Sequence, residues 1–417
     1  MFQVPVDRPA PLRSCRLTCL PAVSRGLLPL AFLLLPLMLT ALSAAETATE
    51  AKPAKPAATA EKLDLRLTLP PVIDAVAGLE TRIVYDNIIL SEEAGKYRYE
   101  VKCEPELGGQ SAEERWWKAV PVPGDVGRHK LTVQVLDEAG KQLAQSSCVL
   151  NVVPADAGKG KPVRLLIVGD SLTHATIWPN ELARLLSEPG NPQWTMLGTH
   201  RPSSAAEGVA HEGYGGWTWS RFVSQYEPNP DGTYRKRSSP FVYLGEDGKP
   251  ALDLARYFRE ECDGNRPDVV VFLLGINDCF GADPQDPDPR IDGMFEHADT
   301  LLKAFRKEAP QALLGICVTP PGNSRESAFE SNYNGRYPRW GWKRIQHRLV
   351  ERQLALFGTE DAAGKRLSLV PIELGVDPQD GYPDNNSVHP NATGYRRIAT
   401  DIYAWLKARL AAGEIGE

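Results

Sequence analysis

Residues 163–172 read Val-Arg-Leu-Leu-Ile-Val-Gly-Asp-Ser-Leu, a nearly continuous apolar run that ends in a glycine turn. A strand this apolar is expected where both faces of a sheet are covered, as in parallel sheets. Segments 268–274 and 312–318 have the same character, and 367–372 and 194–198 are weaker examples. Helical stretches lie between these strands, so we expect an α/β fold built on a parallel sheet.

The helical stretches are predicted from the spacing of their apolar residues. We expect helices over 180–187, 252–261, 294–308, 342–356 and 392–411. In the last of these, the apolar side chains recur on one face, as in a helix that packs on a sheet. They are Tyr395, Ile398, Ile402, Leu406 and Leu410.

Residues 63–155 have a different texture, with short alternating strands and turn signals that predict a small β-sandwich (Ig-like) domain. We interpret it as a spacer or packing domain, with carbohydrate binding through Trp116 and Trp117 as the alternative. Cys103 and Cys148 both lie in strand-like sequence here. A disulfide between them and a pair of buried thiols both remain open.

The N-terminus has the three parts of a secretory signal. Four arginines precede an uncharged apolar stretch, residues 26–45, that ends in Ser43-Ala44-Ala45. We expect a signal peptide over 1–45, although an uncleaved anchor fits the length, and then an Ala/Pro/Lys linker over 46–62. These features indicate a secreted or periplasmic protein with no membrane insertion after signal cleavage. We expect a bacterial source, because we interpret the glycosylation sequons Asn385-Asn386-Ser387 and Asn391-Ala392-Thr393 as accidental.

Composition and missing motifs exclude several classes of function. The 417 residues carry a net charge of −6 without basic runs, which argues against a nucleic-acid partner. The motifs CxxC, HExxH, GxGxxG and GxxxxGK[ST] are absent, which disfavours a zinc-ribbon or redox site and the metalloprotease and nucleotide-binding motifs, and we expect no cofactor. The GxSxG motif is absent too, which disfavours the α/β-hydrolase fold.

Three polar side chains stand at the ends of the expected elements. Ser171 follows the first apolar strand, Asn277 follows the third, and His389 precedes the last helix. A serine hydroxyl needs a base to act as a nucleophile, and an asparagine amide can donate to an oxyanion. Each residue alone also fits a helix cap or a turn.

Together, the runs VGDSLTH, GINDC and SVHPN, in this order, resemble the SGNH or GDSL hydrolase superfamily over roughly residues 162–411. The resemblance implies an SGNH-type three-layer domain over 160–412 that acts as a metal-free serine esterase. It makes Ser171 the nucleophile and His389 the base. It also implies an oxyanion hole formed by the backbone amides of Ser171 and Gly216, the latter in the run HEGYGGWTW, and by the Asn277 side chain.

One departure from the family concerns the partner of His389. The family has Asp three residues before its histidine, whereas this chain has Asn386 there and Asp384 two residues earlier. An Asn carbonyl can orient an imidazole ring but cannot neutralise an imidazolium. Asn386, Asp384, and a carbonyl or another acid all remain candidates.

The substrate is indicated only by class. Trp217, Tyr333 and Trp340 lie in segments expected near the strand ends, and aromatic rings suit stacking on sugars. The chain looks similar to carbohydrate acetylesterases, so we expect an acylated small molecule or polysaccharide as the partner. The alternatives are a short-chain lipid or other carboxylesterase and, in another class, a non-catalytic glycan-binding protein on the same fold.

Overall fold

The computed structural model describes residues 65–229, 231, 237–332 and 335–415. The predicted signal peptide (1–45) and linker (46–62) lie outside these residues. Residues 62–417 form one compact unit, and the boundary between the predicted domains 63–155 and 160–412 stays a prediction. We call residues 65–153 the strand-rich lobe and residues 162–415 the α/β lobe.

The α/β lobe is built on one sheet, as expected. Its strands run in the order β10-β8-β13-β14-β15, with β9 also paired to β8, and every pair is parallel. All residues of β13 and β14 are buried, which confirms the interpretation of these runs as strands covered on both faces. The strands are β8 (Pro162–Gly169), β9 (Gln193–Leu197), β10 (Glu212–Gly213), β13 (Val269–Leu273), β14 (Leu313–Cys317) and β15 (Leu367–Val370).

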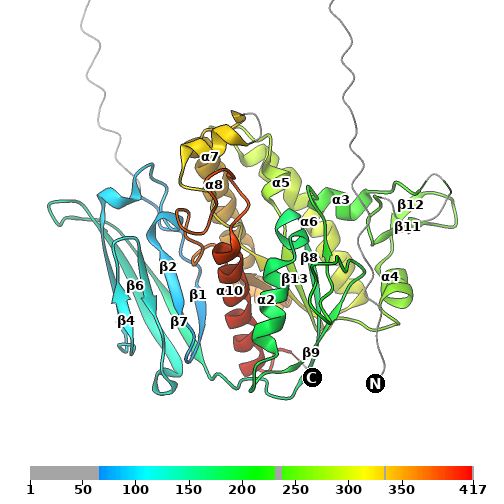
Figure 1. Ribbon diagram of the computed structural model, residues 1–417, viewed down its shortest axis with the longest axis horizontal. Helices are drawn as coiled ribbons and strands as arrows, with labels where there is room; N and C mark the ends of the chain where they lie inside the picture. The colour runs from blue at the N-terminus through cyan, green and yellow to red at the C-terminus, as the bar shows by residue number, and fades with distance from the viewer. Residues whose placement is uncertain (1–64, 230, 232–236, 333–334, 416–417) are drawn as a thin grey trace, which may run out of the picture. The chain divides into compact units, whose positions relative to one another are not determined.

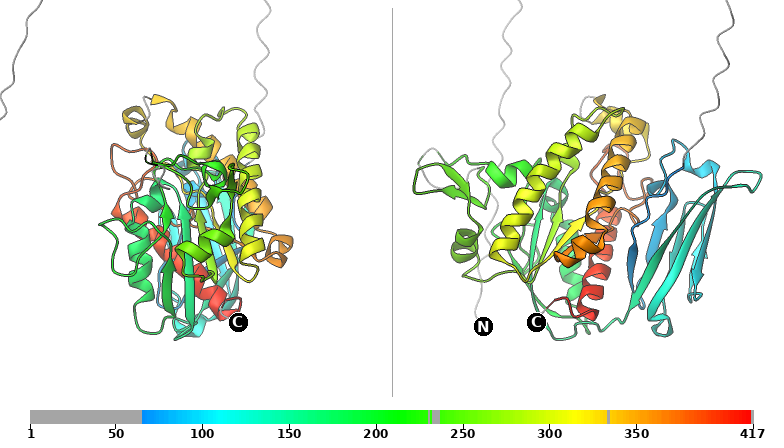
Figure 2. Two further views of the ribbon diagram at one scale, coloured as in Figure 1. Left: turned by 90° about the vertical axis from the view of Figure 1, so that its right-hand side faces the viewer. Right: turned by 180° about the vertical axis from the view of Figure 1, so that it is seen from behind.

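Helices cover both faces of this sheet and complete three layers. α2 (Ile177–Leu186) and α10 (Ala392–Ala411) lie on one face, and α6 (Asp288–Glu308) and α8 (Arg339–Phe357) on the other (Figures 1 and 2). None of the described helices is both long and apolar enough to cross a membrane. The remaining elements of the lobe are α1 (Ser171–His174), α3 (Trp219–Ser224), α4 (Leu254–Glu261), α5 (Ile276–Cys279), α7 (Glu326–Ser331), α9 (Glu360–Gly364), β11 (Val242–Leu244) and β12 (Pro250–Leu252).

Helix α10 is buried on more than the one predicted face. The five predicted apolar residues are buried, but so are Trp405 and even Lys407. The reason is that α10 lies between the parallel sheet and strand β1 (Val72–Val76) of the strand-rich lobe (Figure 1). The Lys407 ammonium is satisfied there by the Gly190 carbonyl and the Asn191 side chain, at 3.1 and 3.0 Å.

The strand-rich lobe consists of two facing sheets, which fits the predicted β-sandwich. One sheet has the order β1-β7-β6-β3 and the other β2-β5-β4. All pairs are antiparallel except β1 with β7. The elements are β2 (Thr81–Val84), β3 (Arg98–Glu104), β4 (Gln110–Ala112), β5 (Trp116–Ala119), β6 (Gly127–Leu136) and β7 (Gln142–Val153), with the 3-10 turns η1 (Tyr85–Asn87), η2 (Ala94–Lys96) and η3 (Pro123–Asp125).

Two interpretations of this lobe need correction. Trp117 is only 1% exposed in the core between the sheets, so its ring is not available to a glycan. Cys103 and Cys148 are both free, buried thiols. They face Leu131 of β6 from opposite neighbouring strands, so they lie two strand spacings apart, about 10 Å. That separation is too great for a disulfide.

Candidate active site

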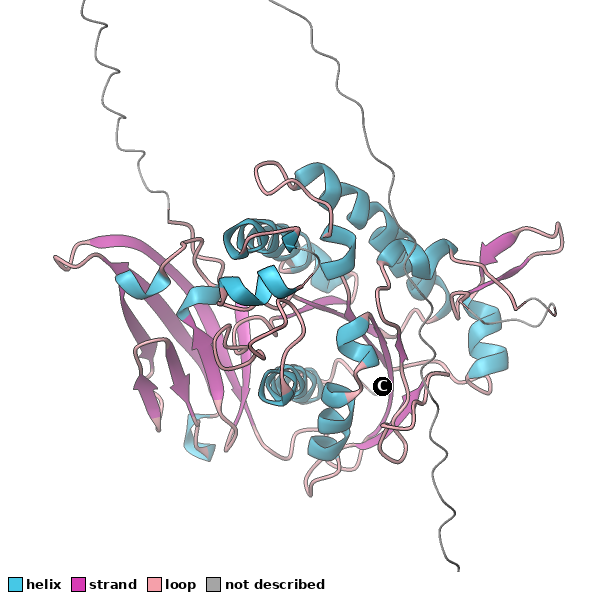
Figure 3. Ribbon diagram, turned by 45° about the horizontal axis from the view of Figure 1, so that its top comes forward, coloured by secondary structure: helices cyan, strands magenta, loops and turns pink. Residues whose placement is uncertain are grey.

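The register of the parallel sheet brings the sequence motifs to one edge. Gly169 of β8 pairs with Gly213 of β10 on one side and with Leu273 of β13 on the other. The segments that carry Ser171, Gly216 and Asn277 therefore leave the sheet at the same level. Figure 3, which tilts the end with α3 and α5 towards the viewer, shows short helices and loops over these strand ends. Ligands of parallel sheets bind at such an edge.

Ser171 is the first residue of α1 and lies beside His389. Asp170 caps this short helix, because its Oδ1 accepts from the Leu172 amide at 2.9 Å. The Ser171 amide, in the first turn, has no partner within the helix and is free to donate to a ligand. The Ser171 Oγ lies 2.8 Å from His389 Nε2, which is hydrogen-bond distance for a nucleophile and its base.

The other ring nitrogen of His389 lies 3.1 Å from Asn386 Oδ1. The same oxygen accepts from the backbone amides of Val388 and His389 at 3.2 and 2.9 Å. Asp384 lies elsewhere: its side chain is 89% exposed and forms an ion pair with Arg325 at 3.3 Å. Of the two candidates, the structure therefore brings Asn386, and not Asp384, to the histidine ring.

This arrangement sets the proton state of His389. If Nδ1–H donates to the neutral Asn386 oxygen, the lone pair of Nε2 faces the Ser171 hydroxyl, as a general base requires. Partial burial lowers the pKa of His389 below its ordinary value. The asparagine carries no charge that would oppose this effect, so the ring stays neutral to lower pH than a free histidine.

The Trp217 carbonyl links Asn277 to the turn that contains Gly216. Gly216 has φ +74° in a turn closed by the Trp217 amide and the Tyr214 carbonyl, at 3.2 Å, a position that favours glycine. One amide hydrogen of Asn277 goes to the Trp217 carbonyl at 3.0 Å. Because the Asn277 side-chain amide has two hydrogens, the second is left for another acceptor.

Two buried carboxyl groups support this framework. Asp278 Oδ1 accepts from the Trp219 amide at 3.1 Å and so connects α5 to the chain that follows the Gly216 turn. Burial raises the pKa of Asp278 to about 7, and burial together with the nearby Asp278 raises the pKa of Asp170 to about 7. Over residues 65–415, apart from the short gaps, no group of three His, Cys, Asp or Glu side chains could hold a metal ion.

The aromatic residues predicted to stack on a sugar differ in how far they are buried. Trp217 is 8% exposed and packs on Tyr214 and Phe222, with ring centroids 4.8 and 4.9 Å away. Its ring therefore belongs to the core, and the prediction that it stacks on a sugar is not supported. Trp340 is half-buried, and Tyr333 lies outside the described residues.

Asn323 is a residue that the sequence did not single out. Its side-chain amide donates to the carbonyls of Pro383 and Asn386, at 2.7 and 2.9 Å, and its backbone amide donates to the Ser387 carbonyl at 2.8 Å. Asn323 thereby fixes residues 383–387, the segment that carries Asn386. Only its place after Pro-Pro-Gly at the end of β14 could have suggested a role.

Comparison with known proteins gives a family and distant structural likenesses. The model of the GDSL-like lipase/acylhydrolase family matches residues 167–397. No curated protein matches the chain significantly.

Three solved structures illustrate the structural likeness. An acetyl esterase mutant with acetate ion has 16% identity and TM-score 0.38 and covers 60% of this chain and 99% of its own. A carbohydrate esterase family 3 protein from Talaromyces cellulolyticus has 16% identity and TM-score 0.35, with the same coverage. A carbohydrate acetylesterase family member from Sinorhizobium meliloti has 19% identity and TM-score 0.35, again with 60% and 99% coverage. Values this low carry no conclusion about a substrate.

Proposed function

The chain belongs to the GDSL-like lipase/acylhydrolase family and is a carboxylic ester hydrolase, and we propose that it is a secreted serine esterase for short acyl groups on a polysaccharide. Acetyl is the acyl group that we expect. The observation that carries the proposal is the 2.8 Å contact between Ser171 Oγ and His389 Nε2 at the carboxyl edge of the parallel sheet. Secretion rests on the N-terminal sequence pattern alone.

The first half of the reaction forms an acyl-enzyme. Ser171 Oγ attacks the ester carbonyl while His389 Nε2 takes the hydroxyl proton. The negative charge that develops on the carbonyl oxygen is received by the backbone amides of Ser171 and Gly216 and by the Asn277 side chain. When the tetrahedral intermediate collapses, the imidazolium of His389 gives its proton to the leaving alcohol.

The second half returns the enzyme to its starting state. A water molecule takes the place of the alcohol, and His389 removes one of its protons as the water attacks the acyl carbonyl. Collapse of this second intermediate breaks the bond to Ser171 Oγ, which regains its proton from His389. Asn386 holds the ring in the tautomer that both halves need, but it supplies no charge to stabilise the imidazolium.

The packing beside Gly216 supports a small acyl group as substrate. Trp217, next to Gly216 in the chain, is packed into the core with Tyr214 and Phe222 instead of lining an open apolar trough. A long acyl chain would need such a surface to be removed from water. The half-buried Trp340 remains the candidate for stacking on a sugar ring.

Activity assays on purified protein test the proposal. We expect hydrolysis of p-nitrophenyl acetate, slower hydrolysis of longer acyl esters, and acetate release from acetylated xylan or pectin. Ser171→Ala should abolish activity, and a serine-directed phosphonate should label Ser171 alone. Ser147→Ala, at an exposed serine of the strand-rich lobe, is the matched control and should behave as wild type. Full activity in Ser171→Ala would refute the proposal.

If longer acyl esters are hydrolysed faster than p-nitrophenyl acetate, the enzyme is instead a lipid or general carboxylesterase. Release of acetate from small esters but from no polysaccharide would restrict the substrate to small molecules.

A further inference from the structure

The segment that carries His389 is a long connection without helix or strand. It runs from the end of β15 to the start of α10, residues 371–391, and we call it the histidine loop. Connections of this length without secondary structure are uncommon in compact domains unless they are functional. It makes hydrogen bonds within itself, such as that of the Gly381 amide to the Asp377 carbonyl at 2.8 Å, and its contacts with other segments place it relative to Ser171.

The second half of the loop is held by the α/β lobe. The contacts of Asn323 were described above. In addition, Asn332 Oδ1 accepts from the Ser387 amide at 2.7 Å. The α/β lobe also contacts the first half of the loop, because Ser324 donates its backbone amide to the Pro378 carbonyl at 2.9 Å.

The strand-rich lobe holds residues 373–376, within the first half of the loop. Asn87, in η1, is buried, and its side-chain amide donates to the carbonyls of Glu373 and Val376, at 2.6 and 2.8 Å. The amide of Val84 donates to the Leu374 carbonyl at 2.8 Å. The Leu374 side chain, 2% exposed, is part of the sandwich core itself.

An arginine adds a charged contact at the next turn of the loop. Arg115, which directly precedes β5, forms ion pairs with Asp377 at 3.2 Å and with Asp380 at 2.5 Å. Asp377 is buried, whereas the Arg115 side chain is about one-third exposed. Charge-assisted bonds to a partly buried carboxylate are stronger than neutral ones.

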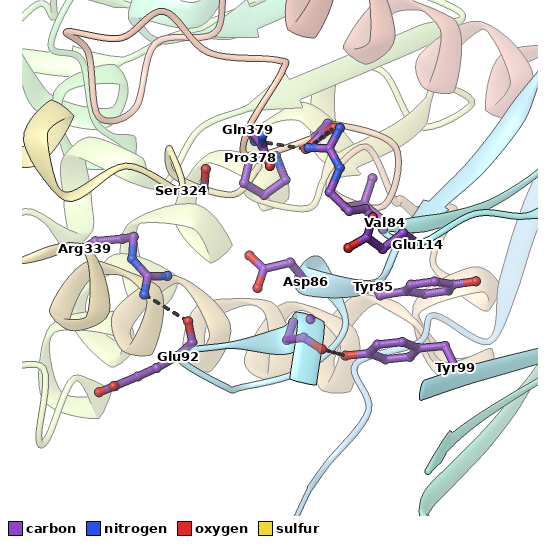
Figure 4. A pocket seen from close by; sticks show the side chains of 14 residues that line it. Val84, Tyr85, Asp86, Glu92, Tyr99, Glu114, Ser324, Arg339, Pro378 and Gln379 are labelled. Atoms are coloured by element: carbon purple, nitrogen blue, oxygen red, sulfur yellow. Dashed lines mark hydrogen bonds and ion pairs between the residues drawn. The ribbon is translucent and has the colours of Figure 1, made fainter. Parts of the chain in front are cut away.

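A cavity borders the loop beside these contacts. It has a volume of about 400 Å³ and lies between the two lobes, with Asp377, Pro378 and Gln379 of the loop in its wall. Figure 4 shows Pro378 and Gln379 on one side of it and Asp86 and Tyr85 on the other. Residues 371–378 are nevertheless buried, so close packing and the polar anchors together fix this stretch, and Gln379 and Asp380 are its exposed end.

We propose that the strand-rich lobe is a positioning element of the active site, which places His389 through the anchors Asn87 and Arg115. The inference rests on the proposed Ser171–His389 chemistry. Neither anchor touches the reacting atoms; both act through the loop. The lobe is thus more than the spacer that its sequence suggests.

The test compares Asn87→Ala with a matched control. Asp74→Asn removes a contact between the same lobes, the 2.9 Å ion pair of Asp74 with Arg409 of α10, but does not touch the histidine loop. The assays are kcat/KM, which reports acylation, on p-nitrophenyl acetate and on an alkyl acetate. An alkoxide leaving group depends more strongly on the proton from His389 than p-nitrophenolate does.

We expect kcat/KM of Asn87→Ala on the alkyl acetate to fall about 10-fold to 100-fold, the scale of a small misplacement of a catalytic group. The fall should be smaller on p-nitrophenyl acetate. In Asp74→Asn the ratio of kcat/KM on the alkyl acetate to kcat/KM on p-nitrophenyl acetate should equal that of wild type, even if the melting temperature changes. Arg115→Ala, at a more exposed site, is the second variant if Asn87→Ala fails to fold, and Arg115→Lys should restore part of its loss.

If the folded variants of Asn87 and Arg115 keep the wild-type ratio of kcat/KM on the two substrates, the inference is wrong. It is also wrong if Asp74→Asn changes this ratio as much as they do, because the effect would then come from a general loosening of the contact between the lobes. Ser171→Ala separates this outcome from failure of the proposed function. If Ser171→Ala is inactive while the anchor variants equal wild type, only the positioning role is wrong; if it is active, the proposed chemistry fails and this inference with it.

Discussion

The neutral partner of His389 leads to a prediction about pH dependence. All three bonds that the Asn386 side chain accepts go to Oδ1. Asn386→Asp therefore keeps every acceptor in place and exchanges only the amide nitrogen for an oxygen. What changes is the charge, since a carboxylate then lies next to the ring.

The size of the effect follows from the distance. Opposite charges about 4 Å apart attract by about 4 kcal/mol at an effective dielectric constant of 20 and by about 1 kcal/mol in water. His389 and Asn386 are both half-buried, so we take about 2 kcal/mol, between these limits. This attraction favours the imidazolium and so raises the pKa of His389 in Asn386→Asp.

The direction is fixed by the role of His389 as a base. Only the neutral ring accepts the Ser171 proton, so the base is lost as pH falls through the pKa of His389. In the wild type, burial lowers this pKa, and the acidic limb of kcat/KM should lie below the ordinary histidine range. In Asn386→Asp the limb should move upward. Above it, kcat should equal or exceed that of wild type, by up to about 30-fold if the full 2 kcal/mol reaches the transition state.

The assay is kcat/KM on p-nitrophenyl acetate from acidic to mildly alkaline pH. Asp384→Asn is the control, because it removes a carboxylate only two residues away that is exposed and paired with Arg325. We expect it to leave the profile unchanged. The reasoning is refuted if the acidic limb of Asn386→Asp does not move, or if Asp384→Asn shifts the limb downward, which would make Asp384 the electrostatic partner.

Two further changes test the site and the core. Asn277→Ala should lower kcat by about 10²–10³ with little change in KM, because its bond to the substrate oxygen strengthens in the transition state; a normal kcat would make Asn277 a structural residue. Trp117→Ala should destabilise the protein by about 3–5 kcal/mol through the cavity it leaves, measured by urea unfolding, whereas Trp340→Ala, at a half-buried site, should cost much less; equal losses would contradict the assigned burial.

The sequence was informative wherever the deciding interactions are local or regular. The nearly continuous apolar runs of β8, β13 and β14 predicted a covered parallel sheet, because such a sheet removes both faces of a strand from water. The placement of Ser171 and Asn277 followed from the same rule, since parallel strands end at one edge. The short alternating strands of residues 63–155 likewise predicted a sandwich, and the structure has two facing sheets there.

The choice between Asn386 and Asp384 needed the tertiary structure, although the two residues are close in sequence. Arg325, which comes from another connection, draws Asp384 outward, while Asn323 and the local turn hold Asn386 beneath the ring. Neither partner could be identified from spacing around His389. The physical reason is that the competing contacts join residues far apart in the chain.

The sequence by itself determined the α/β sheet and the order of the Ser171, Asn277 and His389 motifs at its edge. The reason is that local patterns of apolar residues predict which strands are buried and in which direction they run. Only the tertiary structure decided which residues those motifs depend on. Asn87 reaches a loop almost three hundred residues away, because packing between the two lobes, with Leu374 in the sandwich core, brings η1 and the histidine loop together. Such pairings arise from packing between distant segments, which leaves no period or motif in the chain.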